Sequence, residues 1–281
     1  MKKYIFIFSI FFSTTAFSQE KPKLVVGIVV DQMRYDYVYR FWNQFQDDGI
    51  KRLVNEGYFF RNNHFGYVPT YTGPGHASIF TGTTPSVHGI IGNNWYDKVN
   101  AESVYCAGDG NSNTVCDCEN HTDINSSSGK MSPHRMLSTT IGDELKLFSP
   151  SSKVIGISLK DRGAILPAGH SANAAYWMDK DGAWITSDYY MDQLPEWVSE
   201  HQSKKPASSY FKGKWKGSDF DYNLDTLLAQ KGPGAIKSLP QGNTILKDLA
   251  KAVIKKEALG KDNKTDFLSV SFSSTDYIGH Q

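Results

Sequence analysis

The sequence predicts an α/β fold, in which a mainly parallel sheet is flanked by helices. Runs of β-branched residues that are typical of buried strands recur along the chain, and helical patterns separate them. The length of 281 residues is enough for one large domain or two modest ones. Hydrophobic residues make up 40% of the chain, as is ordinary for a folded protein.

The first residues have the pattern of an export signal. Lys2 and Lys3 precede an apolar run at residues 4–12, and Ala16 and Ser18 on either side of Phe17 supply the small–x–small pattern for cleavage. We therefore expect a signal peptide at residues 1–18 and a periplasmic or secreted protein. The apolar run is short for a bilayer span, so we expect no membrane anchor after cleavage.

The first strand and helices follow directly. Residues 24–30 form a continuous aliphatic run, which is typical of a strand buried on both faces. A short helical pattern at residues 50–56 ends at Gly57, and a second helix is expected to begin at Thr72.

The later elements repeat this alternation. A helix is expected at residues 138–148 with Ile141, Leu145 and Phe148 on one face, followed by a strand at residues 153–158. Another helix is expected at residues 244–259, followed by a strand at residues 266–272. The apolar face predicted for the helix at 244–259 consists of Ile245, Leu249, Val253 and Ile254.

The composition of the sequence changes in the segment at about 171–241. Aromatic residues on either side of the turn at residues 179–182 indicate a hairpin, and turns rich in Lys, Gly and Ser follow. We interpret this segment as a cap inserted into the α/β domain that spans residues 19–281.

Polar side chains follow three of the expected strands. Asp31 ends the first strand, Lys160 and Arg162 follow the strand at 153–158, and Asp276 follows the strand at 266–272. Ligands of α/β sheets bind beyond the carboxyl ends of the strands. These residues are therefore the first candidates for a site, although Lys160 and Arg162 could instead form a surface ion pair with Asp161.

Three cysteines lie in one polar excursion. In an exported protein the default is a disulfide that joins Cys106 to Cys116 or Cys118 and leaves one thiol free. The sharper alternative is a structural zinc site with His121 as the fourth ligand. The 30 basic and 29 acidic residues nearly cancel, so we expect no nucleic-acid-binding surface.

The segment PTYTGPGHAS contains the strongest local signal. Its glycines and prolines form a turn that leads into a helix, and Thr72 stands at the helix start. A hydroxyl there would lie in the positive field of free backbone N–H groups. Thr72 could also be a plain helix cap, and neighbouring Thr70 precedes the turn.

Several separated motifs resemble one known family. The stretches VVDQMRYDY, PTYTGPGHASIFTGTTPSVHGI, NNWYD, LKDRGAILPAGH and SFSSTDYIGHQ are similar to the alkaline phosphatase superfamily, and most closely to its bacterial threonine-nucleophile phosphatases of the phosphate-irrepressible type. The motifs keep the family's order from about Lys23 onward. The resemblance implies an alkaline phosphatase-like fold. It also implies hydrolysis of small-molecule phosphate monoesters through a phosphothreonine intermediate.

The resemblance also implies roles for individual residues and two zinc ions. Thr72 matches the nucleophile and a metal ligand, and Asn93 matches a residue that binds a phosphoryl oxygen. The remaining matches are a basic pair that contacts the phosphate, Lys160 and Arg162, and metal ligands at Asp31, Asp276 and His280. It gives His76 and His88 no metal role, and the same donors alone would also suit manganese or iron.

Sister families differ at the same motifs. Sulfatases begin the turn with Cys or Ser and end it with Arg, whereas this chain has Thr72 and His76. Nucleotide pyrophosphatases and phosphodiesterases of the superfamily lack the Lys-x-Arg pair, so diester hydrolysis is the second expectation. A non-catalytic exported protein that binds phosphate or metal is the third.

Members of the family continue well beyond the last of these motifs. The part beyond it carries further metal ligands. The resemblance therefore implies that this chain is a truncated, N-terminal portion of such an enzyme, without the C-terminal part of the fold, and that its own activity is doubtful.

Overall fold

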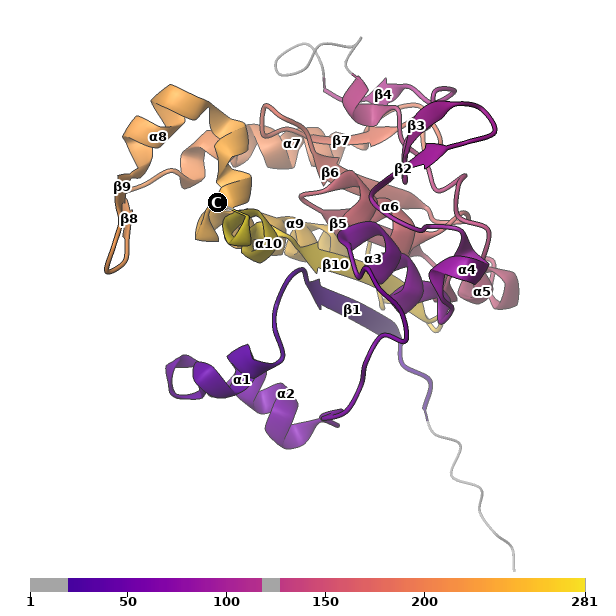
Figure 1. Cartoon of the computed structure of the whole chain (residues 1–281), viewed down its shortest axis with the longest axis horizontal. Coiled ribbons are helices and arrows are strands. Elements are labelled where there is room, and N and C mark those ends of the chain that lie inside the picture. The colour runs from indigo at the N-terminus through magenta and orange to yellow at the C-terminus, as the bar shows by residue number, and fades with distance from the viewer. Residues whose placement is uncertain (1–19, 118–126, 281) are drawn as a thin grey trace, which may run out of the picture.

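The computed structural model describes residues 20–117 and 127–280 (Figure 1). The expected signal peptide, Cys118 and His121 lie outside the described residues. Within the described part of the chain, no helix combines the length and the apolar character that a bilayer crossing requires.

A six-stranded sheet forms the centre of the structure, in the order β1-β10-β5-β6-β7-β4. Neighbouring strands from β1 to β6 are parallel, and β7 and β4 join them antiparallel. The expected mainly parallel sheet is therefore confirmed. The strands are β1 (Leu24–Val30), β4 (Thr114–Val115), β5 (Val154–Ser158), β6 (Ala174–Met178), β7 (Trp184–Ser187) and β10 (Asp266–Phe272).

The helices Asp161–Ala168 and Pro240–Lys256 pack against the sheet, whereas the helices Asp36–Arg40 and Ile50–Glu56 lie away from it, and two hairpins form sheets of their own (Figure 1). The hairpins are β2 (Asn94–Asp97) with β3 (Glu102–Tyr105), and β8 (Lys214–Lys216) with β9 (Asp221–Asn223). The helices are α1 (Asp36–Arg40), α2 (Ile50–Glu56), α3 (Thr72–Thr81), α4 (Pro85–His88), α5 (Ile141–Phe148), α6 (Asp161–Ala168), α7 (Glu196–Lys204), α8 (Leu224–Lys231), α9 (Pro240–Lys256) and α10 (Ser274–Gly279), with 3₁₀ helices at Trp42–Gln44, Ser127–Gly129, Ala207–Tyr210 and Pro233–Ser238.

The alternation of side chains along β5 divides the core into two layers. Ile155 and Ile157 are buried in one cluster with residues of α9. Gly156 points the other way, where a Cβ atom would lie 2.2 Å from the carbonyl oxygen of Ala164 in α6. Since only a glycine allows this approach, α6 packs directly on the strand and its N-terminus lies at the strand's carboxyl end.

The first strand differs from the expectation of burial on both faces. In β1, Val25, Val26 and Ile28 are 38%, 41% and 60% exposed. The reason is its position, because β1 is an edge strand that pairs with β10 alone within the described residues. An aliphatic run therefore predicted the strand correctly but not its burial.

Only part of the expected apolar face of α5 is buried. Leu145 packs against Val154 and Phe267, whereas Ile141 and Phe148 are 58% and 76% exposed. The buried Asp143 forms a capping box with Thr140, and its carboxylate also accepts a hydrogen bond from the backbone of Ser171 at 2.7 Å. The polar N-terminal end of this helix therefore attaches it to the core together with Leu145.

The disulfide expected for Cys106 is wrong. Cys106 is a free, fully buried thiol, and Cys116 is the cysteine that is disulfide-bonded. Cys106 is buried because it follows β3 and packs in the same apolar cluster as Ala77 of α3. The zinc alternative involved residues that the structure does not describe.

The segment at about 171–241, interpreted above as an inserted cap, also supplies two strands of the central sheet. The hairpin expected around residues 179–182 is confirmed, and its strands β6 and β7 extend the central sheet. The following part carries α7, the hairpin β8–β9 and α8, and the hairpin and α8 lie at one end of the molecule (Figure 1). The division of the chain into a catalytic domain and a cap stays a prediction.

Candidate active site

The carboxyl ends of three neighbouring parallel strands bring the predicted residues together. Asp31 follows β1, Asp276 lies in the short helix after β10, and Lys160 follows β5. Thr72 is the first residue of α3 and reaches the same place. The strand order β1-β10-β5 explains the meeting of residues that are far apart in the sequence.

The ammonium group of Lys160 lies at the centre of the cluster. Its side chain is only 2% exposed. Nζ donates to Asp31 Oδ2 at 2.7 Å, to Thr72 Oγ1 at 3.3 Å and to Asp276 Oδ2. A buried ammonium is stable when it is paired and hydrogen-bonded, and here two carboxylates provide the pairing. A surface ion pair with Asp161 is therefore wrong for Lys160.

The hydroxyl of Thr72 is held inside the cluster and does not cap its helix. The helix has no side-chain cap, and its N-cap residue is Tyr71. Thr72 is 8% exposed, and its hydroxyl donates to Asp31 Oδ2 at 3.1 Å. The alternative role as a plain cap is thus wrong, whereas Thr70, in the preceding loop, is exposed.

Asn93 stands beside the turn that carries Thr72. The backbone N–H of Gly73 donates to Asn93 Oδ1 at 2.7 Å. Because an N–H must meet the oxygen, this bond fixes the orientation of the amide and leaves its NH₂ group as the donor end. A Cβ atom on Gly73 would lie 3.2 Å from the same oxygen, so a glycine allows this close approach.

Arg162 lies in the first turn of α6, next to Lys160. Its Nη1 donates to the hydroxyl of Tyr105 at 2.9 Å, and its Nε is buried without a hydrogen-bond partner among the described residues. Burial opposes the charge of Arg162, but Tyr105 and Asp161 outweigh it and raise the pKa of the guanidinium. A positively charged guanidinium with a buried N–H that has no hydrogen-bond partner is suited to binding an anion.

Asp276 and His280 come together as their spacing predicted. His280 Nε2 lies 3.4 Å from Asp276 Oδ1 across one turn of α10. The imidazole is 69% exposed, so it lies at the open side of the cluster.

His76 ties the turn of Thr72 to the central sheet. Nδ1 lies 2.8 Å from the carbonyl oxygen of Thr72 and Nε2 lies 2.7 Å from Ser271 Oγ on β10. The carbonyl only accepts, so Nδ1 carries a proton. Burial lowers the pKa of His76, which therefore stays neutral. His88 is also buried, and its Nε2 lies 2.9 Å from the hydroxyl oxygen of Ser78 in α3.

The side chains of the site include donor types that could bind a metal ion. Carboxylate oxygens and an imidazole nitrogen are ligand types that zinc takes; Asp31 contacts the hydroxyl of Thr72, and Asp276 lies beside His280. Among residues 20–117 and 127–280, no three His, Cys, Asp or Glu side chains are gathered closely enough to hold an ion. The donor types suit zinc, but the described residues supply only part of a coordination shell.

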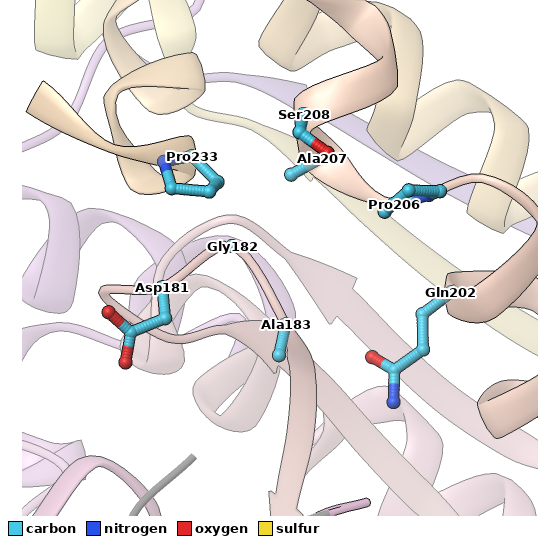
Figure 2. A pocket seen from close by; sticks show the side chains of 8 residues that line it. All are labelled: Asp181, Gly182, Ala183, Gln202, Pro206, Ala207, Ser208 and Pro233. Atoms are coloured by element: carbon cyan, nitrogen blue, oxygen red, sulfur yellow. The ribbon is translucent and has the colours of Figure 1, made fainter. Parts of the chain in front are cut away.

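A separate cavity in the cap does not contribute. It lies between the turn at residues 181–183, the end of α7 and the 3₁₀ helices at Ala207–Tyr210 and Pro233–Ser238, as Figure 2 shows with Asp181, Gln202 and Pro233 among its lining residues. Its volume of about 60 Å³ is far below the size of a small-molecule site. This cavity is therefore not a second candidate site.

One group of this site had no signal in the sequence. Tyr105 contacts Asp161 and Arg162, but it lies on a hairpin strand with an ordinary composition. Only the packing of the hairpin against α6 brings them together. His76 carried a weak signal, since it stands one helical turn after Thr72.

Comparison with known proteins gives a family. Residues 25–281 match the model described as type I phosphodiesterase / nucleotide pyrophosphatase. A Myroides odoratus protein named calcium-transporting ATPase is 46% identical over 93% of this chain and 52% of its own. Alkaline phosphatase PhoV of Synechococcus elongatus is 44% identical over 93% of this chain and 51% of its own. Alkaline phosphatase PafA of Elizabethkingia meningoseptica is 42% identical over 92% of this chain and 52% of its own.

Solved structures agree with these relatives. The crystal structure of wild-type PafA matches with a TM-score of 0.87 and 42% identity, covering 92% of this chain and 54% of that chain. A further PafA structure, with a TM-score of 0.87, is of a mutant in which a threonine is replaced by serine, and an asparagine, a lysine and an arginine by alanine. The chain thus spans about half the length of the relatives it matches.

Proposed function

Since the chain belongs to the type I phosphodiesterase / nucleotide pyrophosphatase family of the alkaline phosphatase superfamily, we propose that its site hydrolyses phosphate monoesters. Thr72 is the nucleophile and forms a phosphothreonine intermediate. Asn93, Lys160 and Arg162 bind the phosphoryl group. The substrates are small-molecule phosphate esters.

One observation carries this proposal. The ammonium of Lys160 contacts the hydroxyl of Thr72 and the carboxylates of Asp31 and Asp276 at the same time. A hydroxyl needs stabilisation of negative charge before it can attack phosphorus. A buried cation at 3.3 Å from the hydroxyl oxygen supplies it.

The residues substituted in the PafA mutant support the assignment. Their types and order are those of Thr72, Asn93, Lys160 and Arg162. The threonine and the asparagine are separated by the same number of residues in both chains, and so are the lysine and the arginine.

The chain's own residues would act as follows. The proton of Thr72 lies toward Asp31, which orients the hydroxyl. The NH₂ group of Asn93 and the unused donors of Arg162 would bind the phosphoryl oxygens. The N-terminal turn of α3 adds a positive field at the same point. Phosphoryl transfer depends mostly on such positioning and charge stabilisation.

Two zinc ions would complete the charge of the site. Asp31 and Thr72 would hold one ion, and Asp276 and His280 the other. When bound, such ions supply stabilisation of the attacking and leaving oxygens.

The test is hydrolysis of p-nitrophenyl phosphate by the chain loaded with zinc. We expect turnover that Thr72→Ala lowers by at least about a thousandfold, because no other hydroxyl meets Asp31 and Lys160 among the described residues. Thr70→Ala is the matched control and should leave turnover unchanged. Turnover that survives Thr72→Ala would contradict the proposal.

The same assay separates the other candidates. A higher rate on bis(p-nitrophenyl) phosphate would favour a phosphodiesterase, and a higher rate on ATP would favour the activity that the name of the Myroides relative indicates. Binding of inorganic phosphate without turnover would favour a non-catalytic phosphate-binding protein. The pairing of Lys160 with Arg162 favours monoesters, whose phosphoryl group carries the larger charge.

We also propose a periplasmic or secreted location, on the basis of the charged and apolar pattern at residues 1–18. Fractionation of cells that express the whole chain tests it. Recovery in the cytoplasm with an uncleaved N-terminus would contradict it.

A further inference from the structure

The guanidinium group of Arg162 is held by a residue outside the predicted site. Tyr105, the last residue of β3, accepts a hydrogen bond from Arg162 Nη1 at 2.9 Å and donates one to Asp161 Oδ1. We propose that Tyr105 is a positioning residue that fixes the plane of the Arg162 guanidinium for phosphate binding. This inference rests on the proposed phosphate role of Arg162.

Every proton of this arrangement is determined by its partners. A guanidinium only donates and a carboxylate only accepts. The single proton of Tyr105 must therefore point to Asp161, and a lone pair of the same oxygen accepts from Arg162. Burial, and then Asp161, raise the pKa of Tyr105, so the phenol keeps its proton. The hydroxyl thus has one orientation rather than several.

This orientation matters because arginine has a long side chain. A free arginine loses much rotamer entropy when it binds an anion, and a side chain held beforehand loses less. With Nη1 bound to Tyr105, the planar fork has its direction set before any ligand arrives. Nε is buried without a partner among the described residues and keeps its donor unused.

The hairpin that carries Tyr105 is itself attached to the nucleophile turn. Asn93, which directly precedes β2, accepts a hydrogen bond at its side-chain Oδ1 from the backbone N–H of Gly73 at 2.7 Å, and its carbonyl oxygen accepts one from the backbone N–H of Cys106 at 2.9 Å. A Cβ atom on Gly73 would lie 3.1 Å from Cys106 Sγ, so the thiol packs closely against this turn. Two consecutive residues, Tyr105 and Cys106, therefore contact Arg162 and the turn of Thr72, and they set the distance between the two.

Calorimetry with inorganic phosphate on the zinc-loaded chain tests the inference in a mutant cycle. Y105F keeps the ring and removes only the hydroxyl, and we expect it to weaken phosphate binding by about tenfold. The loss should vanish in the R162K background, because the lysine cannot present the fork that Tyr105 orients. Y222F, which alters an exposed tyrosine on β9, is the matched control and should bind as the wild type does.

A second readout does not depend on phosphate. Nitrogen-15 NMR of the arginine side chains, with Arg162 assigned through R162K, reports rotation about the Cζ–Nη bonds. We expect slow rotation in the wild type and faster rotation in Y105F. Equal rotation rates would overturn the inference.

The outcomes separate this inference from the proposed function. If R162K weakens phosphate binding and Y105F does not, the positioning role is overturned while the proposed function stands. If R162K binds phosphate as the wild type does, the phosphate role of Arg162 fails and the inference fails with it.

Discussion

Strands β1 and β10 lie side by side in parallel register, yet they have opposite environments. The aliphatic strand β1 exposes Val26 and Ile28, whereas β10 includes Ser269 and Ser271 and is buried almost throughout. The strand order explains the difference, because β10 has neighbours on both sides and β1 has one within the described residues. Position in the sheet, not hydrophobicity alone, decides burial.

The candidate site joins these two strands. Asp31 follows the exposed strand, Asp276 follows the buried one, and Lys160 binds both carboxylates. The Asp276 side of the site therefore lies in the packed core, and the Asp31 side lies at the edge of the sheet. Substitutions on the two sides test how far the stability of each depends on this difference in burial.

The largest effect is expected for Lys160→Met in the presence of a chelator. Removal of the cation leaves Asp31 and Asp276 facing each other, which should lower the free energy of unfolding by about 4 kcal/mol. Chemical denaturation measures it. Lys204→Met, which breaks an exposed pair with Glu200, is the control and should cost less than about 1 kcal/mol. Equal costs would show that the ammonium does not join the two strands.

A pair of truncations compares the strands directly. Leu268→Ala in β10 removes a side chain that is fully buried and should cost about 3 kcal/mol. Ile28→Ala in β1 alters a side chain that is 60% exposed and should cost less than about 1 kcal/mol. Urea denaturation of both variants checks the difference. A cost for Ile28→Ala as large as that for Leu268→Ala would mean that β1 is covered in solution.

The smallest effect concerns α5, where one helix buries a charge and exposes apolar residues. Burial opposes the charge of Asp143, but hydrogen bonds from His170, Thr140 and Ser171 outweigh it and hold its pKa at about 2. A lowered pKa stabilises the fold above the ordinary value of 3.8, and this stability is lost as the pH falls toward 2.

The expected loss between pH 5 and pH 2 is about 2 kcal/mol from this group. Asp143→Asn should remove this part of the pH dependence in urea denaturation. The pKa of His170 is raised, first through its hydrogen bond to Asp143, so its contribution is present at low pH and is lost as the pH rises through that pKa. An unchanged acid limb in Asp143→Asn would contradict the assignment.

Much of the fold could be predicted because its signals are local. The runs at Leu24–Val30 and Asp266–Phe272 gave the bounds of β1 and β10, and Gly57 gave the end of α2. Helix α9 begins at Pro240, before the predicted start at residue 244, because Pro occupies its first turn. The burial of β1 could not be predicted, since it depends on the order of strands that are distant in sequence.

The candidate site also has a part that the sequence predicted and a part that it did not. The residues at strand ends were found because a parallel sheet gathers its carboxyl ends at one edge. The contacts of Lys160 with two carboxylates, and those of Tyr105 with Arg162 and Asp161, depend on packing between segments far apart in the chain. The free thiol of Cys106 was missed because its burial depends on how the β2–β3 hairpin packs against α3.

The most direct test of the account is the position of the phosphate during turnover. The zinc-loaded chain would be mixed with p-nitrophenyl phosphate, quenched in acid and analysed by mass spectrometry of its peptides. We expect a phosphate on Thr72 in the wild type and none in Thr72→Ala. Turnover with phosphate on another residue, or with no phosphorylated residue in the quenched chain, would contradict it.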